Sequence, residues 1–87
     1  MHITAKALET YYREQGLADY AIHDVDDTDE VYPKYWGSVH YSGAFIIMRQ
    51  SDESTYRFYR DYDSYKTSWI ARATLDYEYI FELGLDS

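Results

Sequence analysis

The 87-residue chain has no cysteine and only one proline, Pro33. Without cysteine it can form no disulfide, no thiolate nucleophile and no thiolate-ligated zinc or iron–sulfur site. The absence also fits a reducing compartment, so we expect a cytoplasmic protein. Glycine is sparse and isolated, at Gly16, Gly37, Gly43 and Gly84. No glycine-rich phosphate-binding loop is therefore present.

Long hydrophobic runs are also missing. The longest strictly apolar stretch, Ala44 to Met48, is too short to span a bilayer. The first residues, Met1 to Lys6, lack a basic segment followed by an apolar one. We therefore expect neither a signal peptide nor a membrane anchor.

Positive charge is scarce: eight lysines and arginines stand against sixteen acidic residues, a net charge of −8. Such a chain cannot gain from counterion release, which argues against direct binding to nucleic acid or to anionic membranes. Twelve tyrosines and an aromatic content of 20 % argue for a folded domain despite this charge. A small, acidic, tyrosine-rich domain suits binding to a cationic partner, and clefts that hold nucleic acid are abundant surfaces of that kind.

The length predicts a single compact domain, residues 1–87. The first predicted element is a helix from Thr4, which can cap it, to Gln15. Leu8, Tyr11, Tyr12 and Gln15 mark its inner face. Gly16 is the predicted stop, with Leu17 folding back onto Tyr12.

Strand patterns fill the middle of the chain. They cover Tyr20–Val25, Tyr35–Tyr41, Ala44–Gln50 and Thr55–Tyr59. Ser42 and Gly43 predict a two-residue hairpin turn. The acidic segment Asp24 to Glu30 repels itself and is expected to be a solvent-exposed loop.

The C-terminal third allows two interpretations. Trp69, Ile70, Ala73, Tyr77, Ile80 and Phe81 recur at helical spacing after a cap at Asp63 or Ser64, whereas residues 75–83 also alternate like a strand. We favour the helix. The predicted fold is α+β: an antiparallel sheet of three or four strands, with an N-terminal and a C-terminal helix packed on one face.

Motifs for chemistry are weak. Read from Asp24 as a calcium loop, the segment fails at Thr28, Asp29 and Tyr35. His23 beside Asp24 lacks a nucleophile motif of the G-x-S-x-G kind. We therefore expect structural or surface histidines, no catalytic residue, no metal and no cofactor, and hence a protein that is not an enzyme.

The surplus carboxylates are the predicted partner-binding groups. Glu78 and Glu82 would share one face of a C-terminal helix, where like charges four residues apart are unfavourable unless they are used. The full predicted set lies in the acidic segment, the turn after residue 51 and the C-terminal segment: Asp24, Asp26, Asp27, Asp29, Glu30, Asp52, Glu53, Asp76, Glu78 and Glu82.

The profile of size, charge and α+β composition resembles small acidic inhibitors of phages and mobile elements, namely anti-CRISPR proteins and antirestriction DNA mimics. The segment Tyr20-Ala21-Ile22-His23-Asp24 is similar to one in antirestriction proteins of the ArdA type. This resemblance implies that Asp24, together with Asp19, stands in for phosphate.

The leading hypothesis is an inhibitor, monomeric or homodimeric, that occupies the basic nucleic-acid-binding surface of a host defence complex. Two alternatives stay open. One is an immunity-type inhibitor of a toxin nuclease, and the other is an interaction domain that inhibits nothing. Charge steering would make partner binding by the inhibitor sensitive to salt.

Overall fold

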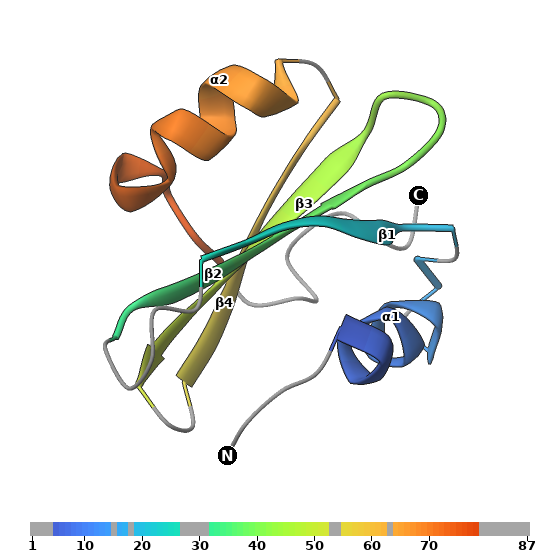
Figure 1. The fold of residues 1–87 in the computed structure, drawn as a ribbon, viewed down its shortest axis with the longest axis horizontal. Coiled ribbons are helices and arrows are strands. Elements are labelled where there is room, and N and C mark those ends of the chain that lie inside the picture. Colours follow the sequence, from blue (N-terminus) through green and yellow to red (C-terminus); the bar gives the residue numbers. More distant parts are fainter. Residues whose placement is uncertain are drawn as a thin grey trace.

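The computed structural model describes residues 5–14, 16–17, 19–26, 32–52, 55–62 and 64–78. The elements are the helix α1 (Ala5–Glu14), the strands β1 (Ala21–Asp26), β2 (Lys34–Val39), β3 (Phe45–Asp52) and β4 (Thr55–Asp61), the helix α2 (Tyr65–Ile70) and the short 3-10 helix η1 (Arg72–Thr74). The four strands form one antiparallel sheet in the order β1-β2-β3-β4 (Figure 1). The predicted α+β class and the antiparallel sheet are confirmed.

Helix α1 follows the predicted pattern. Leu8 and Tyr12 are fully buried, one turn apart, and Tyr11 packs beside them. The helix ends in a Schellman motif: Leu17 N–H donates to Tyr12 O at 2.8 Å and Gly16 N–H donates to Arg13 O at 3.2 Å. Gly16 takes the positive φ of 79° that this ending requires. The predicted cap Thr4 and the last inner residue Gln15 lie outside the described residues.

The β2–β3 connection is one residue longer than predicted. His40 N–H donates to Ala44 O at 2.8 Å, which leaves three residues, Tyr41 to Gly43, in the loop. Gly43 N–H donates to His40 O at 2.9 Å, and Gly43 has a φ of 101°. A turn followed by a glycine at positive φ matches the strand twist as well as a two-residue turn does, so the glycine was identified correctly and the loop length was wrong.

The sheet has a separate core on each face. One cluster joins Leu8 and Tyr12 of α1 to Trp36, Ile46, Met48 and Phe58 of the sheet. The other joins Tyr35, Phe45 and Ile47 to Tyr65 and Trp69 of α2. The prediction that both helices pack on one face is therefore wrong, and Figure 1 shows α1 and α2 on opposite sides of the sheet. The physical reason lies in β3, whose residues Phe45 to Met48 are all buried, so that both of its faces need cover.

The predicted continuous C-terminal helix is also wrong. Helix α2 ends at Ile70, η1 follows, and Leu75 is already extended, with φ −78° and ψ 154°. Glu78 then pairs with Phe58 of β4, each N–H donating to the other residue's carbonyl at 2.7 Å. The edge of β4 offers hydrogen bonds to the segment that follows η1. The aromatic and β-branched residues of that segment favour extended backbone. Within the described part of the chain, no helix has the length and apolar character needed to cross a bilayer.

Candidate functional site: the acidic edge strand

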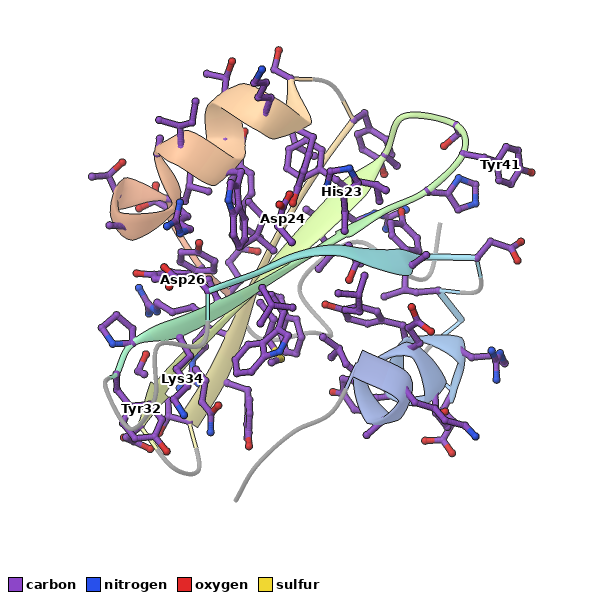
Figure 2. The ribbon with its side chains drawn as sticks, viewed as in Figure 1. His23, Asp24, Asp26, Tyr32, Lys34 and Tyr41 are labelled. Carbon is purple, nitrogen blue, oxygen red and sulfur yellow. The ribbon has the colours of Figure 1, made fainter. Side chains whose placement is uncertain are left out.

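Asp24 and Asp26 lie on β1, at an edge of the sheet. The predicted strand Tyr20–Val25 is confirmed for Asp24, whereas the prediction that the acidic loop begins at Asp24 is wrong, because the strand continues through Asp26. The register shows a β-bulge: Ile22 pairs with Ser38 and Asp24 pairs with the next residue, Gly37, which leaves His23 unpaired. Ile22 packs with the core on the α1 face. The extra residue reverses the alternation, so His23 and Asp24 both lie on the side facing α2 (Figure 2).

Asp24 is held by two donors. Its Oδ2 accepts hydrogen bonds from His23 Nδ1 and from the Tyr65 hydroxyl, both at 2.7 Å. Because an ionised carboxylate can only accept, the His23 proton shared with it sits on Nδ1. The bond from His23, followed by that from Tyr65, lowers the pKa of Asp24 below its usual value. Asp24 therefore stays charged at neutral pH.

Gly37 makes this contact possible. A Cβ at Gly37 would overlap the Tyr65 hydroxyl and would lie 3.1 Å from Trp69 Cε3. Only the bare backbone lets Tyr65 reach across β2 to Asp24. Burial first, and then the bond to Asp24, raises the pKa of Tyr65, so the phenol stays protonated and donates.

Asp26 binds Arg72 of η1. Its Oδ2 accepts from Arg72 Nη2 at 2.9 Å and from Nε at 3.2 Å. The guanidinium carbon also lies 4.5 Å from the Trp69 ring centre and 5.6 Å from that of Tyr35. Arg72 Nη1 donates to Trp69 O at 2.8 Å. The ion pair, the stacking and the backbone bond together fasten the chain after α2 to the edge strand.

Two more carboxylates extend the acidic edge towards the start of β1. Glu9 of α1 accepts the Ile22 N–H at 2.9 Å, and Asp19 precedes the strand with a φ of 70°. Both line a hollow of about 490 Å³ together with Arg13, Tyr20 and Tyr41. We call Glu9, Asp19, Asp24 and Asp26 the β1 carboxylates.

A second hollow, of about 600 Å³, opens on the α2 side of β1. We call it the Asp24 hollow, and it is lined by His23, Asp24, Tyr65, Lys66, Trp69 and Ile70. The helical spacing that groups Ile70 with Trp69 would turn both side chains inward, but Ile70 is 74 % exposed. Helix α2 is only six residues long. Its residues Tyr65 and Trp69, one turn apart, pack on the core, whereas Ile70 faces this hollow.

The other predicted acids lie elsewhere. Asp52 accepts from the Thr55 hydroxyl at 3.0 Å where β3 meets β4. Asp76 and Glu78 are exposed on the segment beside β4, at the opposite edge of the sheet from β1. The described part of the predicted set is thus not gathered into one patch. The remaining predicted acids lie outside the described residues: Asp27, Asp29, Glu30, Glu53 and Glu82.

The histidines are placed apart. His23 meets Asp24, whereas His40 Nδ1 meets the Ser42 hydroxyl at 2.7 Å and accepts the Ser42 N–H at 3.1 Å within its own hairpin. Among these described contacts no serine, histidine and aspartate come together. In the described residues no group of three or more histidines and acids is arranged to hold a metal.

Sequence reasoning missed Gly37, Tyr65 and Trp69 as parts of the site. One signal was available, because a lone glycine between Trp36 and Ser38 in a strand pattern indicates a close approach by another group. No protein-family model matches the chain, and no curated protein or solved structure is detectably similar to it.

Proposed function

We propose that this protein is a non-enzymatic inhibitor that occupies the basic nucleic-acid-binding surface of a host defence complex. The observation that carries the proposal is that the β1 carboxylates gather at one sheet edge: Asp24 and Asp26 lie on the edge strand, Asp19 lies just before it, and Glu9 of α1 accepts a hydrogen bond from its backbone. In the described part of that edge, four acids accompany three basic residues, Arg13, Lys66 and Arg72. The edge is therefore anionic, as is the whole chain at −8.

Rigidity supports the proposal as much as charge does. Glu9 is tied to the Ile22 backbone, Asp24 to Tyr65 and Asp26 to Arg72. Carboxylates that are already fixed lose little entropy when a cationic groove approaches them. The overall negative charge would also speed the encounter by long-range attraction, an effect that salt screens.

The first experiment captures partners from a bacterial lysate on the immobilised protein, at low and at high salt, and identifies them by mass spectrometry. We expect nucleic-acid-binding proteins that salt releases and that duplex DNA displaces. Capture that resists salt, or partners that DNA does not displace, would contradict the proposal.

A matched pair of variants then locates the binding edge on a captured partner. Glu9→Gln with Asp19→Asn removes two charges at β1, and the fold should be kept because Gln still accepts the Ile22 N–H and Asn tolerates positive φ. Asp76→Asn with Glu78→Gln removes two charges at the opposite edge. We expect the β1 pair to weaken binding about ten-fold and the control pair about two-fold. Equal losses from the two pairs would show that β1 is not the binding edge.

A further inference from the structure

The Asp24 hollow joins one fixed carboxylate to an apolar and aromatic wall. Asp24 Oδ2 already accepts two hydrogen bonds, while its Oδ1 accepts none from the described residues. The Asp24 side chain is 37 % exposed, so a ligand can approach Oδ1. The wall is formed by Tyr65, Trp69 and the exposed Ile70.

A ligand for this hollow should be cationic at one end and apolar along its length. Asp24 supplies the negative charge, and its lowered pKa keeps that charge at neutral pH. The aromatic rings add attraction for a cation through their negative faces. Lys66 also lines the hollow and opposes a cation, but it is exposed and can turn its ammonium group into solvent.

The molecule itself displays the chemistry that fits. Arg72 stacks on Trp69 at 4.5 Å while two of its nitrogens bind the Asp26 carboxylate. Asp24 and Trp69 also line the neighbouring hollow, although Arg72 already lies over the Trp69 ring. A guanidinium is more weakly hydrated than an ammonium, and its planar fork of donors is already aligned for a carboxylate, so an arginine side chain should enter this partly apolar hollow at less cost than a lysine side chain.

We propose that the Asp24 hollow receives one arginine side chain of the basic partner, its guanidinium on Asp24 Oδ1 and its aliphatic stem against Trp69 and Ile70. This inference rests on the proposed function and deepens it. It turns a general attraction between charges into an anchoring contact at a defined place, of the kind that dominates interface energetics.

The test is a titration of the full chain with the peptide acetyl-Gly-Arg-Gly-amide, followed by NMR of the Trp69 indole and the His23 ring. The matched ligand is the same peptide with citrulline, which keeps the shape and lacks the charge. We expect shifts at Trp69 and His23 with the arginine peptide and binding at least about five-fold weaker with citrulline.

Protein variants test the assignment of the groups. Asp24→Asn should weaken the arginine peptide about five- to ten-fold, whereas Asp76→Asn, which removes the same charge at the far edge, should change it less than about two-fold. Ile70→Ala, at a residue 74 % exposed, removes part of the wall without touching the core and should weaken binding about two-fold. Lys66→Gln should strengthen it.

Several results would overturn the proposal: equal binding of the arginine and citrulline peptides, an Asp24→Asn affinity equal to that of Asp76→Asn, or shifts confined to residues away from the hollow. These results leave the salt-sensitive capture of nucleic-acid-binding proteins intact, so they separate failure of the arginine site from failure of the proposed function. Ile70→Ala and Lys66→Gln keep the test valid if Asp24→Asn unfolds.

Discussion

Gly37 sets how closely α2 can approach the sheet. It lies opposite Asp24 in the register, and the Tyr65 ring occupies the space where a side chain would be. Alanine in the middle of a strand is normally more stabilising than glycine by about 0.5–1 kcal/mol. Here overpacking, which costs about 1–3 kcal/mol, should outweigh that gain.

We therefore predict that Gly37→Ala lowers the free energy of unfolding by about 1–2 kcal/mol, measured by urea denaturation. Tyr65→Phe removes the overlapping hydroxyl, so Gly37→Ala should cost less in that background than in the wild type. Relief should be partial, because the ring carbon Cζ would still lie 3.0 Å from the new methyl group. Strict additivity of the two substitutions would mean that the Tyr65 hydroxyl is not what excludes a side chain at position 37.

The placement of Asp26 shows what residue patterns could not predict. Five acids in seven residues argue for a loop, because like charges repel. In the structure the strand continues through Asp26, where Arg72, 46 residues further along the chain, supplies the hydrogen-bond donors. Contacts of that separation leave no periodic trace in the sequence.

At the scale of elements, the correct predictions were those that depended on residues close together in the sequence. Helix α1 was predictable because its apolar spacing and its glycine ending act within a few residues. The C-terminal helix was not, because its spacing matched both periods and the open edge of β4 decided the outcome. The bulge at His23, which brings the candidate site together, had no recognised sequence signal.

The docking of α1 gives a prediction for an element. Leu8 is fully buried between the helix and the sheet core, whereas Thr10 is exposed on the same helix. Leu8→Ala should lower the free energy of unfolding by about 2–5 kcal/mol, because it removes apolar contacts and leaves a cavity. Thr10→Ala, the matched control, should stay within about 0.5 kcal/mol. Chemical denaturation followed by tryptophan fluorescence measures both, and a loss as small as that of the control would show that α1 is not docked on the sheet.

For the whole molecule, the sequence predicted the α+β class and the antiparallel sheet, but not the two-sided core. The run Ala44 to Met48 did contain a signal for it, since a strand that is apolar at every position has both faces buried. Placing both helices on one face would have left Phe45 and Ile47, or else Ile46 and Met48, in water. With one helix on each face, β1 pairs with no further strand in the described part of the chain, and its carboxylates lie along that edge.

The net charge also makes the stability of the molecule depend on salt. At −8 the folded chain repels itself, and salt screens this repulsion. Salt also weakens the Asp26–Arg72 pair, but a partly exposed pair contributes only about 0–1 kcal/mol. Screening of the repulsion among the excess carboxylates should therefore outweigh the weakening of this ion pair. The melting temperature should rise by a few degrees between about 0.01 M and about 0.5 M potassium chloride. Removing two charges with Asp76→Asn and Glu78→Gln should reduce this rise. A melting temperature that fell with salt would mean that the folded state depends on its ion pairs more than it suffers from its surplus of carboxylates, and the acids would then already be satisfied without a cationic partner.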